Sequence, residues 1–246
     1  MGHSFDIARS GYINLLQPQD RRSRQPGDTA AALRGRSRLH DRGVTGPLLE
    51  AIAELAAPSP ADRVLDAGCG DGFYLDGLAR RSGFDAHGID ISVAAVDSAA
   101  RRYPGYEWIV ANADRFIPYA DRSFSIVVSI TARMNPGEFH RVLREDGRLL
   151  VALPAPDDLI ELRGPGRDRV ARTIETFAGG FKLAAQRRVS TAADLDAAGV
   201  QDVLHSIYRP MRGGPAEAMR VTFSLDLLLF RALNEREPLP AGNHPR

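Results

Sequence analysis

The chain has 246 residues, and 43% of them are hydrophobic, which is enough for a sizeable core and too many for a disordered polypeptide. Its net charge of +1 gives no general attraction to nucleic acid. Its single cysteine, Cys69, excludes an internal disulfide and a multi-cysteine zinc site. The sequence contains no apolar run of about 18 residues that could cross a membrane and no apolar signal core at its N-terminus, so we expect a cytoplasmic protein.

The first 60 residues are expected to form an arm and two helices that cover a cleft. Asp28 or Thr29 can cap a helix that runs to about His40. A second helix is expected over 47–56, where apolar residues recur at helical spacing. Between Arg21 and Arg42 there are seven arginines and only two acids, a pattern that suits either a phosphate-facing patch or a solvated helix face.

Residues 61–234 alternate short apolar runs with helical patterns, and residues 235–246 form a Pro-rich tail that we expect to be flexible. The alternation indicates an α/β fold, a doubly wound and mostly parallel sheet of seven strands with helices on both faces. Strands are expected at 63–67, 85–89, 107–111, 124–130, 147–153, 181–188 and 219–230. Helices are expected at 73–82, 92–102, 136–144, 156–163, 167–177 and 191–203.

A glycine-rich turn follows the first of these strands, in the sequence Asp66-Ala67-Gly68-Cys69-Gly70-Asp71-Gly72. Asp90 ends the next strand, 18 residues after the last glycine. This is the geometry of a nucleoside-binding βαβ unit. A dinucleotide fingerprint would need glycine where Phe73 stands, and no phosphate-loop lysine follows. The pattern D-x-G-x-G-x-G is instead typical of the first motif of methyltransferases that use S-adenosyl-L-methionine (AdoMet).

The methionine end of AdoMet is therefore expected at the first turn. Asp66 stands at the carboxyl end of its strand, where it can hold the cofactor's amino group. Gly68 and Gly70 let the backbone approach the methionine part, because they carry no side chain.

The nucleoside end is expected at the next two strand ends. Asp90 should accept hydrogen bonds from the ribose hydroxyls, and Ile91 should pack on the adenine ring. Asn112-Ala113-Asp114 follows the third strand, where Asn112 or Asp114 can meet the exocyclic amine of adenine. The alternative is that all of these are ordinary strand-end turns, but their agreement in spacing favours a cofactor site.

Further segments resemble the bacterial 23S rRNA guanine-N1 methyltransferases. These segments are His3 to Leu16, Arg22 to Asp28, Asn135 to Leu143, and Leu159 to Arg163, so the resemblance covers roughly residues 3–163. In that family a small zinc-binding domain helps to engage RNA, and His3 matches its last ligand. The partner cysteines do not occur in this chain, so we expect no bound metal. Either the zinc domain was lost in nature or the start of the chain was trimmed.

Two departures from the family lie on the acceptor side. Thr131-Ala132-Arg133 replaces an aromatic-Ala-Pro turn beside the target base, and Tyr208-Arg209-Pro210 belongs to a changed segment late in the chain. An aromatic side chain is lost and a cation is gained, so Thr131 and Arg133 are candidate substrate contacts. The pattern suggests retained methyl transfer to a changed acceptor.

If the acceptor is a protonated nitrogen, a base must remove its proton. Asp28 and Glu161 are the candidates, although Asp28 can be a helix cap and Glu161 the partner of an arginine. The leading hypothesis is N- or O-methylation of a small molecule in natural-product biosynthesis or self-resistance. The alternative is a 23S rRNA guanine-N1 methyltransferase, and a second alternative is a non-catalytic AdoMet-binding protein. A homodimer is left open.

Overall fold

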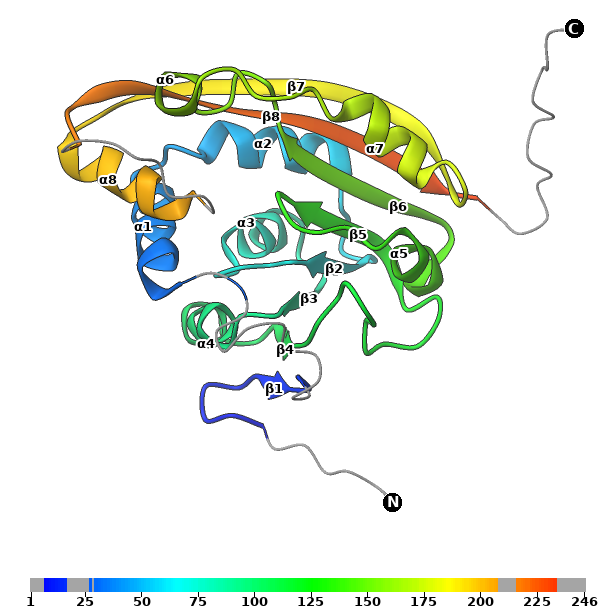
Figure 1. Ribbon diagram of the computed structural model, residues 1–246. Helices are drawn as coiled ribbons and strands as arrows, with labels where there is room; N and C mark the ends of the chain where they lie inside the picture. The colour runs from blue at the N-terminus through cyan, green and yellow to red at the C-terminus, as the bar shows by residue number, and fades with distance from the viewer. Residues whose placement is uncertain (1–6, 17–26, 28, 208–215, 234–246) are drawn as a thin grey trace, which may run out of the picture.

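The computed structural model describes residues 7–16, 27, 29–207 and 216–233. They form one eight-stranded sheet in the order β1-β4-β3-β2-β5-β6-β8-β7, with helices on both faces (Figure 1). The strands are β1 (Ile13–Asn14), β2 (Arg63–Ala67), β3 (Asp85–Asp90), β4 (Glu107–Val110), β5 (Phe124–Ile130), β6 (Leu143–Pro154), β7 (Phe181–Leu195) and β8 (Met219–Ala232). The helices are α1 (Ala30–Asp41), α2 (Gly46–Ala56), α3 (Phe73–Ser82), α4 (Val93–Arg102), α5 (Pro136–Val142), α6 (Ile160–Arg163), α7 (Val170–Phe177) and α8 (Ala197–Ser206).

The predicted fold class is confirmed, because β1 to β6 are parallel where they pair and β8 alone runs antiparallel to its neighbours β6 and β7. All seven expected strands are present. The eighth is β1, which pairs Ile13 with Ile109 and Asn14 with Val110 of β4. A strand of two residues has no periodicity to detect, which is why the sequence did not reveal it.

Several element boundaries differ from the sequence-based expectation; for example, β6 begins at Leu143 and α6 at Ile160 rather than near residues 147 and 156. Two of the shifts at helices share one physical cause. The helix expected from residue 191 begins at Ala197, because β7 continues to Leu195 and the Asp196 side chain accepts a hydrogen bond from the Gly199 backbone N–H. The helix expected over 136–144 ends at Val142, where β6 begins. In both places strand pairing with a distant segment overrides the local preference.

The strands at the centre of the sheet are buried on both faces, as a parallel sheet covered by helices requires. All residues of β5 except Ser125 are buried. Two hydrophobic cores result, one beneath α2, α3 and α4 and the other beneath α5 and α7. This packing fixes where each parallel strand ends, and therefore where the loops after β2, β3, β4 and β5 meet.

Strands β7 and β8 continue past the end of β6. Strand β6 pairs with Leu225–Arg231 of β8, whereas the segment 219–224 pairs with β7 alone. Figure 1 shows this two-stranded extension reaching α8, which lies beside α1. The extension and these two helices therefore form a wall next to the carboxyl ends of the parallel strands.

Candidate cofactor site

The turn between β2 and α3 depends on glycine at three positions. Gly68, Gly70 and Gly72 have φ of 91°, 55° and 81°, in the left-handed region that L side chains rarely adopt. A Cβ at Gly68 would lie 2.3 Å from Cβ of Ala132. The glycine turn after β2 therefore touches the turn after β5, so the candidate cofactor and acceptor segments are in direct contact.

Asp66 presents an incomplete set of contacts. Its side chain is 2% exposed, and its Oδ1 atom has no hydrogen-bond partner among the described residues. Burial, helped by the negative charge of Asp90, raises the pKa of Asp66 to about 8. A buried carboxyl group of this kind suits the ammonium group of a ligand, so Asp66 fits the predicted contact with the methionine end of AdoMet.

Asp90 is held in place by two backbone N–H groups. Its Oδ2 accepts from Gly70 at 3.0 Å, and its Oδ1 accepts from Ser92 at 2.8 Å. Ser92 is itself fixed, because its hydroxyl caps α4 at the Ala95 N–H. A carboxylate accepts hydrogen bonds at about four lone-pair sites, so the two backbone bonds are compatible with the predicted contact to ribose hydroxyls. Ile91 follows it and is partly buried against the core.

The loop after β4 is shaped by amides from two elements. Oδ1 of Asn112 accepts from the Asp114 N–H at 3.1 Å. Nδ2 of Asn135, the residue that caps α5, donates to the carbonyl oxygens of Ala113 and Asp114 at 3.4 and 2.9 Å. This rigid loop lies at the end of β4, next to Asp90 at the end of β3, because the two strands pair. The position fits the predicted adenine contacts.

The two predicted substrate contacts lie in the turn after β5. Thr131 has a φ of 51°, a strained value for a β-branched residue, and its N–H donates to Ala152 of β6. Arg133 is 71% exposed and forms an ion pair with Asp114 at 3.4 Å. The cation thus joins the loops after β4 and β5. Its role as a substrate contact stays a prediction.

The structure places one of the two predicted bases. Asp28 lies outside the described residues. Glu161 is exposed, and its carboxylate accepts hydrogen bonds from the backbone N–H and the hydroxyl of Thr222 on β8. Although desolvation opposes the effect, these bonds hold the pKa of Glu161 below its ordinary value. This carboxylate ties α6 to β8, and its catalytic role stays a prediction.

Sequence reasoning missed Asp158, which follows β6. Burial raises the pKa of Asp158, against opposing effects of the Ser224 N–H and the Arg163 guanidinium. Its negative charge also reaches Tyr74 in the first turn of α3. The available signal was a pair of acids, Asp157 and Asp158, shortly after β6, a strand that ends at the ligand-binding edge of the sheet.

The docking of α1 on the glycine turn was also missed. Asp71, which is 3% exposed, accepts a hydrogen bond from the Ser37 hydroxyl of α1. His40 stacks on Phe73 with ring centroids 3.8 Å apart. Helix α1 therefore packs directly on the glycine turn.

The sheet order, the glycine turn after its central strand β2 and the acid at the end of β3 define a class I AdoMet-dependent methyltransferase. Residues 64–152 match the family model described as a methyltransferase domain. Among solved structures, the fold resembles that of the protein crystallised in complex with the Trm112 methyltransferase activator of Haloferax volcanii. The two chains superpose with a TM-score of 0.61 at 19% identity, covering 85% of this chain and 97% of that one.

Curated relatives identify the family more closely. The chain is 35% identical over 207 residues to the 23S rRNA (guanine(748)-N(1))-methyltransferase of Streptomyces fradiae, covering 79% of this chain and 72% of that protein. It is also 38% identical over 174 residues to YxjB of Bacillus subtilis (strain 168), which is named as a 23S rRNA (guanine-N(1)-)-methyltransferase. That match covers 66% of this chain and 59% of that protein. The chain belongs to the 23S rRNA guanine-N1 methyltransferase family, although it spans less than two thirds of the Bacillus protein.

The described residues contain neither a candidate metal cluster nor a helix that could span a membrane. No group of three or more His, Cys, Asp or Glu side chains there could hold a metal ion. His3 lies outside the described residues, and the absence of bound metal stays a prediction. None of the described helices is long and apolar enough to cross a membrane.

Proposed function

We propose that this chain transfers a methyl group from AdoMet to N1 of a guanine in 23S rRNA. The observation that carries the proposal is the extent of the similarity to the Streptomyces fradiae protein. The match covers 79% of the chain, well beyond the cofactor-binding residues 64–152. The small-molecule acceptor, the leading hypothesis from sequence, rests on the changed turn after β5, the missing zinc-ligand cysteines and the near-neutral net charge. The similarity to the rRNA enzymes covers more of the chain, so we rank the small-molecule acceptor second.

The cofactor supplies a methyl group on a sulfonium, which needs no further activation. The residues of the chain then have to position the reactants and exclude water. Asp66 and Asp90 hold the two ends of the cofactor, and the contact between Gly68 and Ala132 brings the turn after β5 against the cofactor turn. Alignment of this kind contributes on the order of 7–11 kcal/mol to lowering a barrier.

N1 of guanine carries a proton that must leave when the methyl group arrives, so a base is needed. In our proposal Asp158 joins Asp28 and Glu161 as a candidate. Its support is its place after β6 and the reach of its charge to Tyr74. In addition, burial raises the pKa of Asp158, which makes it a stronger base than Glu161, whose pKa is lowered.

Substitution of Asp158 tests this role. We expect Asp158→Asn to lower the single-turnover rate by roughly 10²- to 10⁴-fold, the usual contribution of a general base. Because the pKa of Asp158 is raised, the wild-type rate should fall as the pH drops through this raised pKa, and the fall should disappear in the variant. Glu161→Gln separates the two candidates: if Asp158 is the base, this variant should cost about 1 kcal/mol of stability through its bonds to Thr222 while the rate stays within about threefold. The reverse result would return the role to Glu161.

The second candidate is a small-molecule acceptor. It is favoured by the sequence Thr131-Ala132-Arg133, which offers no aromatic face for a base, an interaction worth roughly 1–3 kcal/mol per base. Arg133 is well exposed and could meet an anionic group if it left Asp114.

One experiment separates these acceptors. Unmodified 23S rRNA is incubated with the protein and radiolabelled AdoMet, and the product is analysed by primer extension. Methylation at N1 removes the Watson–Crick donor of guanine, so reverse transcriptase should stop at one position. In a parallel incubation, a small-molecule extract replaces the rRNA. Label in the extract but not in the rRNA would favour the second candidate. A protein that binds S-adenosylhomocysteine but labels neither would be a non-catalytic binder.

A further inference from the structure

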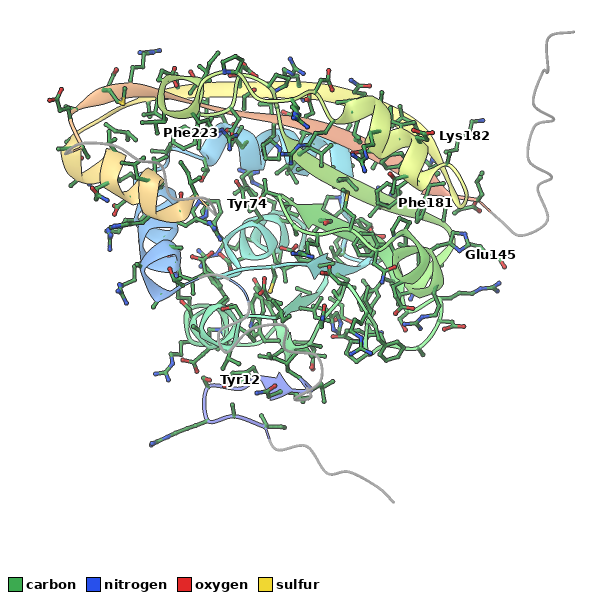
Figure 2. All side chains as sticks on the ribbon, in the orientation of Figure 1. Tyr12, Tyr74, Glu145, Phe181, Lys182 and Phe223 are labelled. Atoms are coloured by element: carbon green, nitrogen blue, oxygen red, sulfur yellow. The ribbon has the colours of Figure 1, made fainter. Side chains whose placement is uncertain are left out.

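Helix α1 brings an arginine to the glycine turn. A Cβ at Gly70 would lie 3.7 Å from Nη1 of Arg36, the nearest group on that side of the turn. The charge of Arg36 also reaches Tyr74 and His40. Burial raises the pKa of Tyr74 and lowers that of His40 to about 4, and the positive charge of Arg36 lowers both. Arg36, a residue of α1, therefore lies close to the glycine turn and to the start of α3. Figure 2 shows Tyr74 on the side of α3 toward the β7–β8 layer.

The neighbours of Arg36 on both sides are anchored. The Ser37 hydroxyl donates to Asp71 inside the glycine turn, and the Arg38 guanidinium binds both carboxylate oxygens of Asp202 on α8. Gly35, which precedes Arg36, lets the backbones of α1 and α8 approach closely because it has no side chain. A Cβ at this position would lie only 2.7 Å from the carbonyl oxygen of Asp202. Arg36 is thus placed by the fold before any ligand arrives, which reduces the entropy lost on binding.

The charges around the turn match an amino-acid zwitterion. Asp66 offers a buried oxygen without a partner among the described residues, which suits an ammonium group. Arg36 offers a guanidinium beside Gly70, which suits a carboxylate. AdoMet carries both groups at its methionine end. We propose that Arg36 binds the carboxylate of the cofactor and so fixes the methionine end between α1 and the glycine turn. This inference rests on one part of the proposed function, namely that AdoMet is the cofactor. It does not depend on RNA as the acceptor.

Two probes isolate this contact, S-adenosylhomocysteine and 5′-methylthioadenosine, because the second lacks the amino-acid end. By titration calorimetry, we expect Arg36→Gln to weaken S-adenosylhomocysteine binding by about 10- to 100-fold, the effect of losing a charge-assisted hydrogen bond. Binding of 5′-methylthioadenosine should change less than about twofold. Arg36→Lys should give an intermediate loss, since lysine keeps the charge but not the planar fork. Arg34→Gln, an exposed residue on the same helix, is the matched control and should bind both probes normally.

Equal losses for both probes would mean that Arg36 supports the fold of the turn, and would overturn the proposal. Unchanged binding of S-adenosylhomocysteine by a folded Arg36→Gln variant would overturn it as well. A wild-type protein that binds neither probe would remove the cofactor assignment together with this inference. A wild-type protein that gives the expected probe pattern but leaves 23S rRNA unmodified would support the inference and contradict only the proposed acceptor.

Discussion

Asp66, the buried acid at the end of β2, allows the proposed cofactor contact to be tested at a single residue. Because burial raises the pKa of Asp66 to about 8, the free protein keeps a proton there at pH 7. This proton stabilises the fold below the ordinary aspartate pKa, and the stabilisation is lost as the pH rises through about 8. An ammonium group beside Asp66 would favour the carboxylate form. Binding at pH 7 should therefore release nearly one proton.

Calorimetry in two buffers of different ionisation enthalpy measures this release. Asp66→Asn should bind S-adenosylhomocysteine more weakly and release no proton. A wild-type protein that binds without net proton release would show that Asp66 does not meet the ammonium group.

Gly68 illustrates a residue that is fixed by two constraints at once. Its φ of 91° is strained for any other residue, and its missing Cβ makes room for Ala132. Gly68→Ala should therefore cost about 2–5 kcal/mol, the sum of a left-handed backbone penalty of about 1–2 and an overpacking penalty of about 1–3. The double variant with Ala132→Gly should recover the packing part but not the backbone part. Chemical denaturation of the wild-type protein, the two single variants and the double variant measures both parts. If the two single losses of stability simply added in the double variant, the contact between Gly68 and Ala132 would be contradicted.

At the scale of elements, the position of α1 depends on its close approach to α8. Gly35→Ala in a free helix would be stabilising by about 0.5–1 kcal/mol. Here the new Cβ would meet the backbone oxygen of Asp202 at 2.7 Å, so we expect destabilisation instead. Gly46→Ala, at the start of α2 with open space around it, is the matched control and should be neutral or slightly stabilising. Thermal unfolding compares the two, and a stabilised Gly35→Ala variant would contradict the observed packing.

The elements that the sequence predicted well are those with local signals. The residues from Asp66 to Asp90 lie in one βαβ unit, so spacing alone predicted the glycine turn after β2 and the position of Asp90 at the end of β3. The contacts that place α1 were not predictable in this way. Ser37 and Asp71 are 34 residues apart, and Arg38 and Asp202 are 164 residues apart. No periodicity links such positions, and only the tertiary structure brings them together.

For the whole molecule, the site joins parts of the fold that would otherwise be independent. The glycine turn contacts α1 through Ser37 and Asp71, and α1 contacts α8 through Arg38 and Asp202. A ligand at 100 times its Kd stabilises the folded state by about 2.7 kcal/mol, which lowers the equilibrium constant for opening about 100-fold. We therefore expect S-adenosylhomocysteine to slow amide hydrogen exchange in α1 and α8 as well as in the turn. Helix α7 packs against β7 on the other face of the sheet. The exchange rates of those amides in α7 that exchange by local opening should not change.

Substitution of Arg38 should break this coupling, because it removes the pair that joins α1 to α8. In Arg38→Met the ligand should still protect the glycine turn, whereas protection of α8 should fall to that of the free protein. Arg187→Met is the matched control, since Arg187 pairs with Glu54 at the surface, away from α1 and α8. Protection confined to the turn in the wild-type protein would show that the cofactor site acts locally. Protection that reaches α8 without Arg38 would assign the coupling to another contact, with the Arg42–Asp196 pair as the next to test.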